Sequence, residues 1–164
     1  FVDGNITDGN NRIITGNVLT GTKITDEGYL GFFERQITVI PEGDEPEMFG
    51  WLIPKPDKFS ISRTLPSWFQ RQLGEVKYKL DTGKHGEQRA FVVTGEYEKV
   101  FPFDIYPVQL LKAIMTNDIE RMENLGLYEV VEEDFALCEV VCTSKIPVQD
   151  TVRNGLELLK EELG

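Results

Sequence analysis

Two cysteines, Cys138 and Cys142, are the residues of this chain with the clearest capacity for chemistry. Four positions apart on one helix, their thiolates could both contact a single soft metal ion or take part in thiol chemistry. The chain has no further cysteine and only one histidine, so a metal centre here would need ligands from a partner chain. We expect instead two reduced, buried thiols that pack as small apolar groups.

A second candidate is the turn from Gly16 to Lys23, which has the glycine spacing of a phosphate-binding loop. Such a loop needs a helix directly after it, because backbone N–H groups at the start of that helix bind the phosphate. Here the lysine and the hydroxyl residue are transposed, and residues 24–28 make a poor start for a helix. We therefore expect a plain turn rather than a nucleotide site.

The single histidine and one acidic run are weaker candidates. His85 lies in a polar segment without a nearby serine or cysteine nucleophile, so it lacks the partners of a catalytic triad. Glu132, Glu133 and Asp134 would suit a cation by charge, although acidic residues are common where a helix begins. We expect a solvated loop histidine and the start of a helix.

The composition limits the classes of function. The chain of 164 residues has 40% hydrophobic residues and a formal net charge of −11. These values are typical of a folded globular protein, and the negative charge makes nucleic acid and anionic lipid poor partners. No apolar run has the length of a membrane-spanning helix. The chain begins at Phe1 and shows no signal peptide, so we expect a piece cut from a longer polypeptide.

Strand patterns fill the first part of the chain and helical patterns the second. From Gly95 onward, apolar residues recur every three or four positions, which is typical of helices. Strands followed by helices predict an α+β fold, with a β-rich domain over 1–96 and a helical domain over 97–164. β-Branched and aromatic runs between turn signals predict the strands: 12–15, 32–40, 47–53, 59–64, 76–80 and 90–94.

Helices are expected at four places in the second domain. Pro107 suits a first helical position. Asn117 is expected to cap the next helix, which Gly126 ends in a left-handed conformation. The acidic residues 132–134 suit the start of a third helix. The buried face of the last helix is marked by apolar residues at helical spacing: Val148, Val152, Leu156, Leu159 and Leu163.

The helical half resembles part of a known redox protein. Residues 117–120, 125–127 and 144–147, together with the two cysteines, are similar to the cluster-bearing subunit of the Rnf electron-transfer complex. That subunit carries the ferredoxin-type run C-x2-C-x2-C-x3-C. Laid onto this chain, the four ligand positions fall on Glu132, Phe135, Cys138 and Cys142. Two thiolates are missing, and a cubane cluster is held by four.

A cluster-less relative accounts for more of the chain. Several blocks in the right order are more specific than any one motif, so we identify a resemblance to the carboxy-terminal region of the A subunit of the bacterial sodium-translocating NADH:quinone oxidoreductases. The similar blocks are residues 14–22, 29–31, 49–51, 58–60 and 95–100.

The resemblance implies a β-grasp-like first domain and a second domain like a ferredoxin-type helical domain without its clusters. It also implies a peripheral subunit on the cytoplasmic side of the bacterial inner membrane, bound to the other subunits. The complex would oxidise NADH, reduce ubiquinone or menaquinone and transport sodium. It assigns no catalytic, cofactor-binding or metal-binding residue and no cofactor to this chain, and the fragment alone should be inactive.

Two other classes of function stay open. One is an electron-transfer module with a metal centre at Cys138 and Cys142. The other is a ligand-binding β-grasp module unrelated to respiration, because that fold serves many functions.

The first domain is rich in large aromatic residues, and we expect ordinary core packing for most of them. Several exposed together would instead form a docking surface or the edge of a quinone pocket. The set comprises Phe32, Phe33, Phe49, Trp51, Phe59, Trp68 and Phe69.

Overall fold

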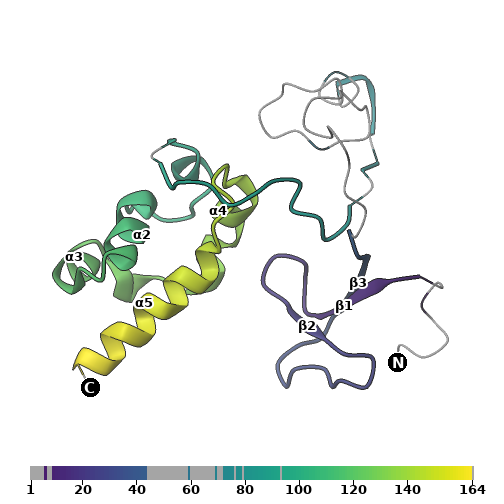
Figure 1. Ribbon diagram of the computed structural model, residues 1–164, viewed down its shortest axis with the longest axis horizontal. Coiled ribbons are helices and arrows are strands. Elements are labelled where there is room, and N and C mark those ends of the chain that lie inside the picture. Colours follow the sequence, from purple (N-terminus) through teal and green to yellow (C-terminus); the bar gives the residue numbers. More distant parts are fainter. Residues whose placement is uncertain are drawn as a thin grey trace. The chain divides into compact units, whose positions relative to one another are not determined.

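The computed structural model describes residues 6, 9–43, 59, 69, 72–75, 77–78, 80–92 and 94–163. The chain divides into two compact units, Phe1–His85 and Gly86–Gly164, and each is described by itself. An antiparallel sheet lies in the first unit, and the second is helical (Figure 1). The predicted α+β fold is confirmed, while the β-grasp detail and the domain division at 96/97 stay predictions.

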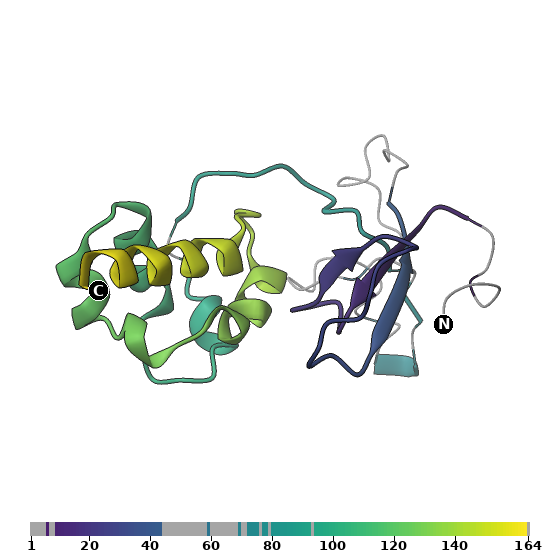
Figure 2. The ribbon, with the colours of Figure 1, turned by 90° about the horizontal axis from the view of Figure 1, so that it is seen from below.

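Within the described residues of the first unit, three strands form a sheet: β1 (Asn11–Thr15), β2 (Thr22–Ile24) and β3 (Ile37–Pro41). Their order is β2-β1-β3 with antiparallel pairing throughout, and Figure 2 shows β1 between its two neighbours. Successive side chains of a strand point to opposite faces. Ile13 and Ile14 of β1 are nevertheless both buried, at 4% and 7% exposure, so the central strand is covered on both faces.

The predicted strand at 32–40 is shorter in the structure, because β3 begins only at Ile37. Just before it, Glu34 N–H donates to Gly31 O at 2.9 Å, and this turn keeps residues 32–36 out of the ladder. β3 pairs with β1; its predicted hairpin partner, 47–53, lies outside the described residues. The short strand β2 was not predicted.

Two further predicted strands, 76–80 and 90–94, are not strands at any of their described residues. At the second of these, the backbone is held by a distant residue instead of a ladder. Arg89 N–H donates to Ser144 O at 2.8 Å, and Ser144 Oγ donates to Ala90 O at 2.9 Å. Of the predicted strand 59–64, only Phe59 is described, and it is not in a strand.

Glu42, directly after β3, ties the first unit together. Arg12 donates to its two carboxylate oxygens at 2.9 and 2.7 Å, Lys23 Nζ donates at 3.0 Å and Thr82 Oγ1 at 2.6 Å. These hydrogen bonds, the one from Arg12 foremost, lower the pKa of Glu42 to about 2. Glu42 therefore joins β1, β2 and the segment around Thr82 through one charged group.

Seven helical elements are seen in the part of the second unit that the structure describes. They are the 3-10 turns η1 (Tyr97–Lys99), η2 (Leu127–Glu129) and η3 (Glu132–Phe135), and the α-helices α2 (Pro107–Met115), α3 (Ile119–Asn124), α4 (Ala136–Val141) and α5 (Val148–Leu163). Each of the four predicted helix positions is occupied.

Most of the local helix signals are confirmed. Pro107 is the first residue of α2, where its missing N–H leaves no hydrogen bond unmade. Gly126 has φ +86°, the left-handed conformation expected after α3. The prediction of Asn117 as the cap is wrong by one residue, because the side chain of Asp118 accepts from Arg121 N–H at 3.1 Å. Asn117 instead takes a left-handed conformation, φ +53°, in the link from α2.

The core of the second unit lies between α5 and the other helices. α5 packs against α2, α4 and η3. Figure 1 shows α5 running along the whole helical unit. Val148, Val152 and Leu159 are at most 2% exposed, which confirms the predicted apolar face at those positions. Gly155, for which no sequence pattern predicted a packing role, is buried against Ile114 where α5 crosses α2.

Candidate functional site

The two cysteines are core residues. Cys138 lies within α4 and Cys142 directly after it, and they are 0% and 1% exposed. Burial, followed by the charge of Glu98, raises the pKa of Cys138 to about 12, so this thiol stays protonated at neutral pH. The prediction of two buried thiols that pack as small apolar groups is confirmed.

The other positions of the ferredoxin-type ligand set are engaged elsewhere. Phe135 is fully buried, and its ring centroid lies 4.6 Å from that of Phe101. Glu132 pairs with Arg153 at 3.0 Å. Among the described residues, no group of three or more His, Cys, Asp and Glu side chains is placed to hold a metal ion.

Tyr97 is a feature of this core that sequence reasoning missed. It is 2% exposed, and its hydroxyl has no hydrogen-bond partner among the described residues. Burial, and then the neighbouring Cys142 thiol, raise the pKa of Tyr97 above its ordinary value. The phenol therefore stays neutral, and Phe91 lies against its ring, with the two centroids 5.8 Å apart. In the sequence, the signal for this buried phenol would have been a tyrosine at a position that the helical pattern marks as apolar.

The glycine turn has the geometry of a plain turn, as expected. The side chain of Asn17 accepts from Leu19 N–H at 2.7 Å and Thr20 N–H at 3.0 Å. The segment then enters β2 rather than a helix, so it does not offer the helix start that a phosphate would need. His85 is exposed in a loop, where its Nε2 lies 3.5 Å from Asp81 Oδ1.

The acidic run lies at the start of a helix, as expected. Asp134 accepts from Val131 N–H at 2.9 Å, and the three acidic residues occupy η3 just before α4. Negative charge is favourable at this end of a helix. Glu132 is further engaged by Arg153, so the run has a structural role in the fold.

The loop between β2 and β3, residues 25–36, presents large aromatic side chains to solvent; we call it the aromatic loop. Tyr29, Phe32 and Phe33 are 91%, 95% and 90% exposed. The rings of Phe32 and Phe33 meet edge to face with their centroids 5.0 Å apart. The expectation of core packing is therefore wrong for these two phenylalanines. Of the remaining predicted aromatic set, Phe59 and Phe69 are exposed as well, and Phe49, Trp51 and Trp68 lie outside the described residues.

The base of the aromatic loop is fixed by hydrogen bonds to the sheet. Gly31 N–H donates to Thr15 Oγ1 at 3.1 Å, and Gly16 N–H donates to Gln36 O at 2.8 Å. Gly16 has φ +91°, and a Cβ there would lie 2.9 Å from a carboxylate oxygen of Glu34. The loop thus leaves the sheet in a defined direction while its aromatic tip faces water.

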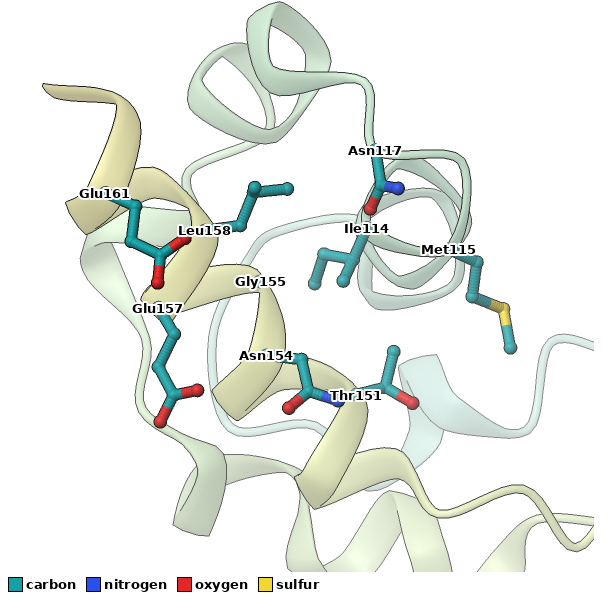
Figure 3. A pocket seen from close by; sticks show the side chains of 9 residues that line it. All are labelled: Ile114, Met115, Asn117, Thr151, Asn154, Gly155, Glu157, Leu158 and Glu161. Atoms are coloured by element: carbon teal, nitrogen blue, oxygen red, sulfur yellow. The ribbon is translucent and has the colours of Figure 1, made fainter.

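A groove of about 410 Å³ lies between α2 and α5; we call it the α2/α5 groove. Figure 3 shows Ile114 and Leu158 turned toward one another between the helices, with Glu157 and Glu161 along the outer side of α5. The lining comprises Ile114, Met115, Asn117, Thr151, Asn154, Gly155, Glu157, Leu158 and Glu161. The floor is apolar and one rim is acidic.

In the part of the chain that the structure describes, no helix is both long and apolar enough to cross a membrane. The chemically capable side chains named above are either buried in the core or engaged in local structure. Two accessible features of the described residues, the aromatic loop and the α2/α5 groove, have the character of contact surfaces.

Comparison with known proteins identifies relatives of the chain. No protein-family model matches it. It is 42% identical over 161 residues to the A subunit of the Na(+)-translocating NADH-quinone reductase of Yersinia pestis, 97% of this chain and 35% of that protein. The same subunit of Serratia proteamaculans (strain 568) is 40% identical over 160 residues, and that of Actinobacillus pleuropneumoniae serotype 5b (strain L20) is 42% identical over 155 residues, 97% and 94% of this chain respectively.

The chain spans about a third of the length of these relatives, 35% and 34%. The resemblance drawn from its sequence blocks is confirmed: over nearly its whole length, the chain is similar to the A subunit of Na(+)-translocating NADH-quinone reductases.

Proposed function

We infer that this chain is the carboxy-terminal region of a peripheral A subunit. It would bind that subunit to the other subunits of a sodium-translocating NADH-quinone reductase. The names of the relatives support this assignment. The complex would lie in the bacterial inner membrane with this region on the cytoplasmic side. Reduction of ubiquinone or menaquinone, coupled to sodium transport, would belong to the whole complex. We assign no residue of this chain a catalytic or cofactor-binding role and expect the chain alone to be inactive.

The single observation that supports docking is the aromatic loop. Phe32 and Phe33 together expose nearly their full surface, at 95% and 90%. Aromatic residues dominate the centres of protein interfaces, where burying each one contributes a large share of the binding energy. Because the base of the loop is held by hydrogen bonds to Thr15 and Gly16, little conformational entropy would be lost on binding.

The test replaces Phe32 and Phe33 with serine in the full-length polypeptide of the assembled complex. Both side chains are exposed, so the fold should tolerate the change. The matched control is Leu73→Ser with Leu80→Ser, because these residues of the same unit are also exposed, at 88% and 65%. We expect the aromatic double variant to co-purify with the membrane subunits at least about tenfold more weakly, and the control to assemble normally.

Two results would refute the docking role of the loop. The first is normal assembly and NADH-quinone reductase activity of the F32S/F33S variant. The second is equal hydrogen exchange of residues 28–36 in the complex and in the isolated full-length polypeptide, since a loop covered by another subunit would exchange more slowly in the complex.

A further inference from the structure

We propose that the α2/α5 groove binds a segment of a membrane subunit that carries lysine or arginine beside a large apolar side chain. The inference rests on the proposed function and extends it, because it assigns a second contact and the chemistry of its partner. It concerns the helical unit alone, and the aromatic loop belongs to the other unit.

The floor of the groove suits an apolar anchor. Ile114 and Leu158 face each other from the two helices, and Met115 is 47% exposed at the edge. Gly155 presents no side chain, so α2 and α5 approach closely here and Ile114 closes the floor of the groove against the backbone of α5. Methionine is flexible and adapts to a docked side chain. The volume of about 410 Å³ accommodates more than one side chain.

The rim of the groove carries two negatively charged side chains. Glu157 and Glu161 stand one turn apart on α5, both are exposed, and neither makes an ion pair within the described residues. Like charges at this spacing destabilise a helix by a few tenths of a kcal/mol. One turn earlier, Arg153 is paired with both Glu132 and Asp150, and it offsets the charge of Glu157 only in part, without a direct ion pair. A cation from a partner would relieve the repulsion between the two glutamates.

A protein segment fits the groove better than a small molecule does. Small-molecule sites enclose their ligand and direct a few polar groups inward from buried positions. Here the polar lining residues Asn117, Asn154 and Glu157 are exposed at the rim, where they can contact backbone groups of an extended or helical segment.

The charge of the partner follows from where the protein is proposed to dock. Cytoplasmic loops of membrane proteins carry an excess of lysine and arginine. The chain has a net charge of −11, so association with such loops is electrostatically favoured and steered. Glu157 and Glu161 place part of this charge directly beside an apolar floor. The general attraction would therefore direct a basic segment to this groove.

Charge reversal in the full-length polypeptide of the assembled complex tests the inference. Glu157→Lys with Glu161→Lys should weaken binding to the membrane subunits at least about tenfold, with a smaller salt dependence than the unaltered protein. Glu87→Lys with Glu162→Lys is the control, because it changes the net charge equally at exposed positions of the same unit outside the groove. The control should bind within about twofold of the unaltered protein.

A second experiment identifies the occupant. The photo-cross-linking residue p-benzoylphenylalanine replaces Asn154, which is exposed at the rim, in the assembled complex. Cross-linking to a lysine- or arginine-bearing segment of a membrane subunit supports the inference. It is overturned if the cross-link falls within the same polypeptide or on a second copy of it, or if both charge variants lose binding equally.

The two proposals can fail separately. If F32S/F33S weakens assembly and E157K/E161K does not, the groove has no docking role while the proposed function stands. If the polypeptide does not co-purify with any membrane subunit in unaltered form, the proposed function itself fails.

Discussion

Gly155→Ala should destabilise the helical unit, although it replaces glycine with the best helix former. Gly155 lies within α5 and is buried against α2. A Cβ built at this position would lie 2.9 Å from both Cγ1 and Cγ2 of Ile114 and 3.1 Å from Cδ1. Ile114 is itself only 5% exposed and its β-branched side chain has few alternative rotamers. The added methyl group must therefore push the two helices apart.

Two opposing terms set the size of the effect. Glycine to alanine in a helix interior gains about 1 kcal/mol from backbone entropy and propensity. Inserting a methyl group into a packed contact costs about 1–3 kcal/mol. The net expectation is a loss of roughly 1 kcal/mol in the free energy of unfolding. For a unit of this size, that loss lowers the melting temperature by about 4–8 °C.

Urea unfolding followed by circular dichroism at 222 nm measures this change. Asn154→Ala is the matched control, because Asn154 is the neighbouring position of α5 and is exposed. It should raise stability by about half a kcal/mol through propensity alone. If Gly155→Ala stabilises the protein as Asn154→Ala does, the close approach of α2 and α5 at this point is refuted.

Three further predictions concern the core residue Phe135, the hydrogen-bonded carboxylate of Glu42 and the two cysteine thiols. Phe135→Ala should cost about 3–5 kcal/mol in the free energy of unfolding because Phe135 is fully buried, whereas Leu137→Ala, 48% exposed, should change it by less than about half a kcal/mol in the same urea titration. Folding lowers the pKa of Glu42 from 4.5 to about 2, so its contribution to stability is complete above pH 4.5 and is lost as the pH falls toward 2; the unfolding midpoint of Glu42→Gln should accordingly vary less between pH 5 and pH 2 than that of the unaltered protein. Cys138 and Cys142 are buried, and the pKa of Cys138 is raised to about 12, so neither thiol should react with Ellman's reagent at pH 8 until urea unfolds the protein, and rapid reaction of the folded protein would contradict this.

Local signals explain why the helical half could be predicted well from the sequence. Pro107 begins α2 and Gly126 follows α3 in a left-handed conformation, because the preference of each residue depends on its own backbone geometry. The cap at Asp118 rather than Asn117 is an error of one residue between two side chains that cap equally well. The apolar face of α5 follows directly from its period.

Long-range contacts explain where prediction failed. Residues 90–94 have strand-like composition, yet Ser144, far along the chain, holds the backbone of Arg89 and Ala90. The exposure of Phe32 and Phe33 also escapes pattern reading, because aromatic composition does not say which side chains face water.

The α2/α5 groove could likewise be predicted from the sequence only in part. The spacing of Glu157 and Glu161 is visible in the sequence as an acidic pair on one helix face. The groove beside them is not visible, since it forms only when Ile114 meets Gly155 and Leu158 across two helices. No local preference reports on such a crossing.

The hydrogen bonds around Thr82 have a topological consequence. Thr82 N–H donates to Pro41 O at 3.2 Å, and Gly43 N–H donates to Thr82 Oγ1 at 2.9 Å. The polypeptide therefore departs from the end of β3 and comes back to the same spot. Pro41 and Gly43 on one side and Thr82 on the other therefore hold together two parts of the chain that lie about 40 residues apart in the sequence. A change in the length of the chain between these anchors would leave β3 and both hydrogen bonds unaltered, and its cost in loop-closure entropy would grow only slowly with length.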